Sequence, residues 1–149
     1  MEDRPFAMPP VRRIVIELAG EPKGKGRPRF GNGRTYTPQP TRNYEAALRF
    51  AAQAKMQGAA LMEGPLRIEV LAAFSVPKSW SNKKQAAAHA GTVRPTGKPD
   101  IDNVLKTLDA FNSVVWRDDA QIVHATITKR YSDRPRLRIE VEQMFGEGA

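Results

Sequence analysis

The sequence predicts a single α+β domain, a two-layer sandwich in which a mixed sheet of about four strands carries helices on one face. Four segments alternate apolar and polar residues, as half-buried strands do. Other segments place apolar residues three and four positions apart, as helices do. The chain of 149 residues fits one domain, and it shows neither an internal repeat nor a linker, so we expect one unit over residues 1–149.

The alternating segments give the expected strands. The first covers residues 11–19 and the second, which has the most regular alternation, covers residues 65–76. Two more lie around residues 123–128 and 137–142, with Ser132–Pro135 between them. Because this connection is short and rich in turn-forming residues, the last two strands are expected to form an antiparallel hairpin.

The longest helix is expected over residues 41–57, with Thr41 as its N-cap and Gly58 as its stop. Its inward face would hold Tyr44, Ala47, Leu48 and Ala51, with Phe50 as an optional member. A shorter helix is expected before Gly91, capped by Ser79 or Ser81. The intervening residues 20–40 have too many glycines and prolines for a regular element, so we expect a loop there.

Residues 98–119, KPDIDNVLKTLDAFNSVVWRDD, hold five of the sixteen carboxylates. An extended stub after Pro99 would point Asp100 and Asp102 to the same side, because strand side chains repeat every two residues. From Asp102, a favoured N-cap, the pattern becomes helical as far as about residue 112. The polar face of that helix would carry Asp102, Lys106 and Asp109. The pair Asp118-Asp119 precedes a strand, where it could meet the first pair.

Carboxylates brought this close repel one another unless a cation lies between them. A hard divalent cation such as Mg²⁺ is suitable, because it is commonly held by one or two carboxylates together with water and substrate phosphates. Each acid also has a simpler explanation: Asp102 as an N-cap only, Asp109 as a solvated helix position, and Asp118-Asp119 as the tip of a turn.

The combined pattern resembles the RusA-type Holliday junction resolvases, through PKGKGRPR, YTPQPTRNYE, KPDIDNVLKTLDA and WRDDAQI. The resemblance implies a cytoplasmic, nucleoid-associated protein of bacterial or prophage origin. It would be a homodimeric, Mg²⁺-dependent endodeoxyribonuclease, with Mn²⁺ as the alternative ion, that resolves four-way DNA junctions by paired phosphodiester hydrolysis in recombination and repair. Asp100, Asp102 and the pair Asp118 and Asp119 match the family's metal-binding acids, and Lys106 matches its essential lysine.

Two positions within this resemblance stay open. Asp109 matches a recurrent family position whose role is less clear and could be structural. Of the acidic pair, Asp119 is preferred to Asp118 as the direct metal ligand, because neighbouring side chains in a turn that leads into a strand point apart.

Charge is divided along the chain. Residues 1–98 hold 17 Lys and Arg against 7 Asp and Glu, whereas residues 99–149 hold 7 against 9. An acidic metal pocket framed by a basic half suits a polyanion whose phosphate reaches the metal. The candidate DNA contacts, each of which could instead be merely solvated, are Lys23, Lys25, Arg27, Arg29, Arg34, Lys83, Lys84 and Lys98.

Composition excludes other chemistry. The chain has no cysteine, which excludes disulfides, thiolate zinc sites and a cysteine nucleophile, and it has two histidines, His89 and His124, which we expect to be incidental. Residues 1–10 carry no continuous apolar run and are expected to form a mobile leader rather than a membrane span, while residues 145–149 are expected to fray.

Two alternatives in function remain open: a protein that binds branched DNA or RNA without cutting it, and a general flap or single-strand nuclease. For the homodimer, the strand over residues 66–74 and the C-terminal hairpin are candidate interfaces, because a small sheet has edges that a partner can cover.

Overall fold

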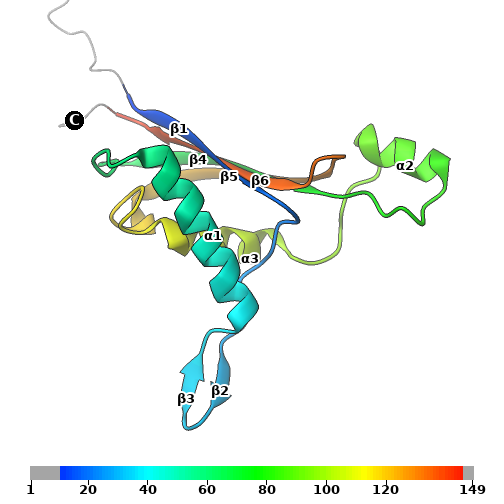
Figure 1. Cartoon of the computed structure of the whole chain (residues 1–149). Helices are drawn as coiled ribbons and strands as arrows, with labels where there is room; N and C mark the ends of the chain where they lie inside the picture. Colours follow the sequence, from blue (N-terminus) through cyan, green and yellow to red (C-terminus); the bar gives the residue numbers. More distant parts are fainter. Residues whose placement is uncertain (1–10, 146–149) are drawn as a thin grey trace, which may run out of the picture.

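The computed structural model describes residues 11–145, so most of the expected mobile leader and frayed tail lies outside the described residues. A mixed four-stranded sheet, in the order β1-β6-β4-β5, supports helices on one face, which confirms the α+β prediction (Figure 1). Its strands are β1 (Arg13–Ala19), β4 (Leu66–Phe74), β5 (Ile122–Tyr131) and β6 (Arg136–Gln143).

The last two strands do not form the predicted hairpin. β6 pairs antiparallel with β1 and with β4, and β4 lies between β6 and β5. β5 pairs with β4 in parallel. β4 takes the central place because its apolar side chains, such as Ile68 and Val70, are fully buried, whereas β5 is largely exposed. The expectation that residues 66–74 form an edge for a partner was therefore wrong; the edges are β1 and β5.

α1 (Gln39–Met56) lies across the helical face of the sheet (Figure 1). It begins two residues earlier than expected, with Pro38 at the N-cap position and no side-chain cap. Thr41 is not the cap; its hydroxyl accepts a hydrogen bond from the Gly26 N–H at 2.9 Å. The buried face of α1 consists of Thr41, Tyr44, Leu48, Ala52 and Met56.

The predicted inward face of α1 was therefore right for Tyr44 and Leu48 and wrong for Ala47 and Phe50, which are exposed. Phe50 leaves 73% of its surface in solvent. The stripe that repeats every three to four residues from Thr41 passes through Ala52, so residues 47 and 50 fall outside it.

The chain after β4 crosses over to β5 through α2 (Asn82–His89), α3 (Ile101–Lys106) and the 3₁₀ helices η1 (Thr107–Phe111) and η2 (Asp119–Gln121). Ser81 caps α2 by accepting the Lys84 N–H at 3.2 Å, as one of the two predicted caps. The predicted helix to residue 112 is instead the short α3 followed by η1. No helix in residues 11–145 is long and apolar enough to cross a membrane.

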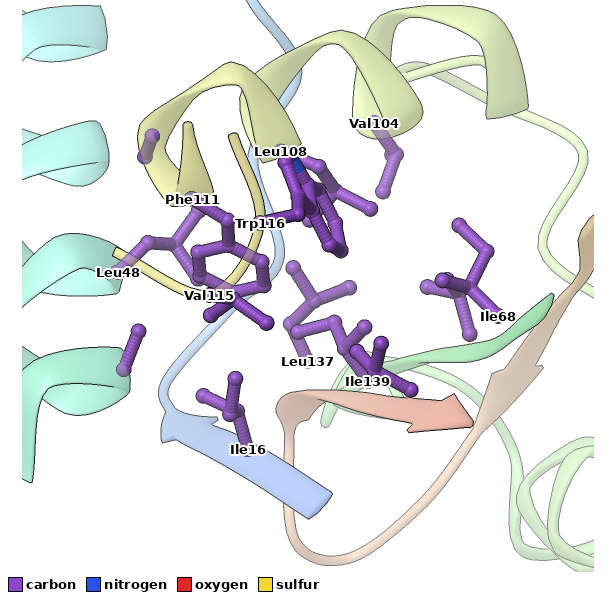
Figure 2. Close-up of a cluster of buried hydrophobic side chains, with 14 of the residues drawn as sticks. Ile16, Leu48, Ile68, Val104, Leu108, Phe111, Val115, Trp116, Leu137 and Ile139 are labelled. Carbon is purple, nitrogen blue, oxygen red and sulfur yellow. The ribbon is translucent and has the colours of Figure 1, made fainter. Parts of the chain in front are cut away.

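The core lies between the sheet on one side and α1, α3 and η1 on the other (Figure 2). Phe111 and Trp116 meet edge to face with ring centroids 5.6 Å apart, and both are fully buried. The Trp116 indole N–H donates to the Asn112 side-chain oxygen at 2.7 Å. These contacts fix η1 and the segment that follows it against Leu137 and Ile139 of β6.

Within residues 20–40, expected to be irregular, the structure has a hairpin of β2 (Arg29–Gly31) and β3 (Arg34–Tyr36) that projects beyond the start of α1 (Figure 1). Its two-residue loop is Asn32-Gly33, with φ of 52° and 76°. Asn-Gly suits such a loop, because both residues tolerate positive φ. The prediction of no regular element was wrong for this reason.

Candidate active site

The polar side of α3 and η1 lines a cavity of about 220 Å³ above the sheet. Asp102, Lys106 and Asp109 share this side, as the helical spacing predicted. Asp119, at the start of η2, joins them. The apolar part of the lining comes from Ile68, Leu105, Leu108, Ile122 and Ala125. Residues separated by seventeen positions, from Asp102 to Asp119, are thus brought to one place by the crossover into β5.

Asp100, not Asp102, caps α3, because the helix begins at Ile101. The Asp100 carboxylate accepts the Asn103 N–H at 2.8 Å. Asp102 therefore lies in the first turn, and its carboxylate is 3.1 Å from the Lys106 ammonium, one turn further on. Both side chains are more than half exposed, so this pair is available to a substrate that enters from solvent.

Asp109 and Asp119 line the same cavity and lie close enough to influence each other. The pKa of Asp119 is raised to about 6. The largest cause is the interaction of Asp119 with the Asp109 carboxyl, and partial burial and the nearby Asp118 add to it. A raised carboxyl pKa means that the second negative charge at this place is unfavourable. A bound cation would remove that cost.

Lys25 holds Asp109 from the other side. Its ammonium lies 3.1 Å from an Asp109 oxygen and 3.3 Å from a Glu45 oxygen of α1. Burial lowers the pKa of Lys25, but the hydrogen bonds and charges of Asp109 and Glu45 outweigh it and leave the pKa above its ordinary value. Lys25, predicted as a DNA contact, is thus occupied by two carboxylates.

The backbone around Lys25 is docked on the start of α3. The Lys25 N–H donates to the Asn103 carbonyl at 2.9 Å. A Cβ at Gly24 would lie 2.8 Å from the Pro99 Cβ and 3.0 Å from the Asn103 Cβ, so this approach requires glycine. The supporting roles of Gly24 and Glu45 were not predicted from the sequence; the glycines that flank Lys25 are the signal that could have indicated them.

Asp118 lies beside the cavity but does not line it. Its carboxylate accepts the Ala120 N–H at 2.9 Å, and this hydrogen bond, followed by its interaction with Asp119, lowers the pKa of Asp118. The Gln121 side chain fixes the turn by accepting the Arg117 N–H at 2.9 Å and donating to the Met62 carbonyl at 3.1 Å. The two neighbouring acids therefore have different environments, and the choice of Asp119 as metal ligand stays a prediction.

The remaining basic candidates do not converge on the cavity. Arg29 and Arg34 are exposed on the projecting hairpin, and the Lys84 ammonium lies over the Trp80 ring, 3.9 Å from its centroid. The others, all exposed, are Lys23, Arg27, Lys83 and Lys98. Whether these residues contact DNA stays a prediction.

The donor set suits an open site for Mg²⁺ rather than a closed cage. No group of three or more His, Cys, Asp or Glu in residues 11–145 is close enough to enclose an ion. Mg²⁺ commonly retains several waters and uses one or two carboxylates. The opposed Asp109 and Asp119, with Asp102 on the same cavity wall, meet that requirement.

Comparison with known proteins identifies the family of the chain. Residues 19–142 match the family Endodeoxyribonuclease RusA. The chain is also 34% identical over 137 residues to the uncharacterized protein YqaN of Bacillus subtilis (strain 168), covering 88% of this chain and 96% of that protein. The matched family region contains all of the strands and helices from β4 to η2, and with them every cavity acid. The chain belongs to the RusA endodeoxyribonuclease family.

Proposed function

We propose that the protein resolves four-way DNA junctions in recombination and repair by Mg²⁺-dependent hydrolysis of phosphodiesters, with Mn²⁺ as the alternative ion. The observation that carries the proposal is the meeting of Asp102, Lys106, Asp109 and Asp119 in one solvent-open cavity, where the nearby carboxyls raise the pKa of Asp119. An acidic cavity of this kind on a protein of net charge +8 would repel DNA unless a cation bridged the two.

One or two of the cavity acids Asp102, Asp109 and Asp119 would hold the metal, with waters in its other positions. When bound, the metal would supply Lewis-acid polarisation of the phosphate and an acidified water. Asp100 and Asp118, the other predicted ligands, are not in the cavity lining and would contact the metal through water. The Asp100 hydrogen bond to Asn103 uses one carboxylate oxygen, which leaves the other for a ligand or a water.

The remaining side chains position these acids and the substrate. Lys106 is held by Asp102 at the cavity rim, where its ammonium can meet a non-bridging oxygen as negative charge develops. Lys25 fixes the Asp109 carboxylate between α1 and η1. Ile68 and Leu108, which line the same cavity, limit the water around the reacting phosphate.

Paired incision requires two cavities, and one chain has one, so we propose a homodimer. β5 is the edge strand next to the cavity, since Ile122 and Ala125 line the cavity and the outer side of β5 has no partner strand within the described residues. A second copy placed beside the Ile122 end of this strand would bring two sites onto one junction and leave the rest of the β5 edge open to DNA.

The test is cleavage of a synthetic four-way junction with Mg²⁺, beside a flap and a linear duplex. Asp102→Asn should reduce junction cleavage by about 100-fold or more, because an amide keeps the shape but removes the charge that holds the metal and orients Lys106. Glu63→Gln is the matched control, as Glu63 is an exposed acid outside the cavity.

Near-normal cleavage by Asp102→Asn would overturn the assignment of this site. Equal cleavage of junction and flap would identify a broader nuclease, and junction binding without products at any metal concentration would identify a binding protein.

A further inference from the structure

A second cavity lies at the opposite end of β5 from the acidic site. It measures about 380 Å³ and lies between the C-terminal end of α2, the segment after it and the turn that joins β5 to β6. Its functional side chains are His89, Arg94, Arg130, Ser132, Asp133 and Arg136. No role was predicted from the sequence for the arginines among them.

Positive charge dominates this cavity. Arg94, Arg130 and Arg136 come from three separate segments, and Asp133 is the one acid in the lining. None of the three guanidinium groups is within 4.0 Å of a carboxylate of the described chain, which spans residues 11–145. Converging guanidinium groups without ion-pair partners are expected to attract an anion.

The Arg136 side chain contains an unused donor. Its terminal nitrogen donates to the Arg134 carbonyl at 2.9 Å, which anchors it to the turn. Its Nε is buried and has no acceptor among the described residues. A buried cationic N–H without an acceptor is costly, and an oxyanion in the cavity would satisfy it. Arginine presents its donors as a planar fork that matches the oxygens of a phosphate.

We propose that this arginine cavity, formed by Arg94, Arg130 and Arg136, binds a phosphate group of the DNA backbone in an arm of the bound substrate. This proposal rests on the proposed function, because it takes the phosphate to be part of the DNA substrate. An adjoining hollow shares Arg130 and continues over Thr126, Thr128 and Arg138, with Glu69 at its side. An extended polar surface of this kind suits a backbone track better than an enclosed small-molecule site does.

The length of β5 sets the position of the contact along DNA. Ile122 lines the acidic cavity and Tyr131 lines the arginine cavity. Nine strand steps at about 3.3 Å each separate the two by about 30 Å. Thr126, Thr128 and Arg130 point to the face of β5 opposite to Ala125, so an arm that reaches them must cross the free edge of β5. At about 3.4 Å per base pair, this requires a duplex arm of about nine base pairs or more from the acidic site.

The test compares junction binding by wild type and by Arg94→Ala/Arg130→Ala in EDTA, using arms of about 20 and about 6 base pairs. Arg136 is left intact because it anchors the turn. The control, Arg49→Ala/Lys55→Ala, removes two exposed charges of α1 that have no ion pair within residues 11–145. Fluorescence anisotropy over a range of NaCl concentrations gives the affinity and its salt slope.

We expect the Arg94/Arg130 variant to bind the long-armed junction about tenfold more weakly, with a salt slope reduced by about one to two, and to match wild type on the short-armed junction. The α1 control should match wild type on both. An equal loss on short and long arms, or no loss on either, would overturn the proposal.

Inorganic phosphate as a probe distinguishes two sources of the bound phosphate group: the DNA backbone and a free phosphate compound. If phosphate raised the melting temperature of wild type but not of the double variant, while DNA binding was identical, the cavity would serve a free phosphate compound and its assignment to DNA would be wrong. Cleavage of the short-armed junction with Mg²⁺ is read separately. Wild type that binds as expected but cuts no substrate would overturn the proposed function and leave the arginine cavity supported.

Discussion

Replacing Lys25 by Met separates a structural role from a DNA contact. Methionine retains most of the apolar stem but removes the ammonium, so Asp109 and Glu45 lose their shared cation. Lys25 leaves 27% of its side chain exposed, against 20% for Glu45 and 44% for Asp109. Exposed pairs contribute about 0 to 1 kcal/mol, and breaking a fully buried pair costs about 3 to 5 kcal/mol.

The Lys25, Glu45 and Asp109 side chains are partly exposed, so the energy of their interaction lies between these limits. It is reduced further because solvent screens Asp109. We therefore expect Lys25→Met to lower the free energy of unfolding by about 1 to 2 kcal/mol. For a chain of this size, each kcal/mol corresponds to about 2 to 4 °C, so the melting temperature should fall by about 2 to 8 °C. Thermal unfolding at low salt in EDTA measures this change.

Lys23→Met is the matched control, because Lys23 is exposed, lies two residues away, and makes no ion pair with the described residues 11–145. It should leave the melting temperature unchanged. The salt slope of junction binding should be the same for Lys25→Met and wild type. An unchanged melting temperature together with a salt slope reduced by about one would show that Lys25 contacts phosphate and that our reading of the triad is wrong.

Three further predictions concern the acidic site, the hairpin and the assembly. Because native Asp119 has its pKa raised from 3.8 to about 6, it binds its proton more tightly than the unfolded chain, so its contribution to the stability of wild type in EDTA should be lost as pH rises from about 4 to about 6. Asp119→Asn should not show this loss when the melting temperature is measured as a function of pH. If the melting temperatures of the two proteins changed with pH in the same way, the repulsion between Asp119 and its neighbouring acids would be contradicted. Arg27→Ala/Arg29→Ala should reduce the salt slope of junction binding by about one per lost contact, with Mg²⁺ affinity unchanged by calorimetry, whereas an unchanged slope would show that the loop is only solvated. Sedimentation at micromolar concentration should give about twice the chain mass of 16.6 kDa, and a monomer both free and on DNA would defeat paired incision.

Local patterns predicted the local elements well. The alternation over residues 65–76 gave β4, and the helical spacing of Asp102, Lys106 and Asp109 placed all three on one cavity wall. Such patterns depend on which face of an element is buried, and that information is present in neighbouring residues. The position of Asp119 in the cavity depends on how a distant segment folds back, so neighbouring residues could suggest it but could not determine it.

Pairings between distant segments could not be read in the same way. The short connection between β5 and β6 favoured a hairpin, but β4 has the stronger apolar face and displaces β5 to the edge. The role of Lys25 depends on three segments, since its partners lie twenty and eighty-four positions away. A sequence shows a lysine in a glycine-rich loop, whereas only the fold shows which carboxylates it meets.

The pairing of β1 with β6 has a consequence for how the protein is made. Arg13 lies opposite Glu142, so the first strand of the described chain has no partner until the last strand has been synthesised. β6 also contributes Leu137 and Ile139 to the core against which η1 packs, and it separates β1 from β4. Contacts of such long sequence separation form late, because a large loop must close before they are gained. A nascent chain that has not reached Arg136 therefore has no completed sheet to support the acidic cavity, and we expect DNA-cutting activity to arise only after the whole domain has left the ribosome.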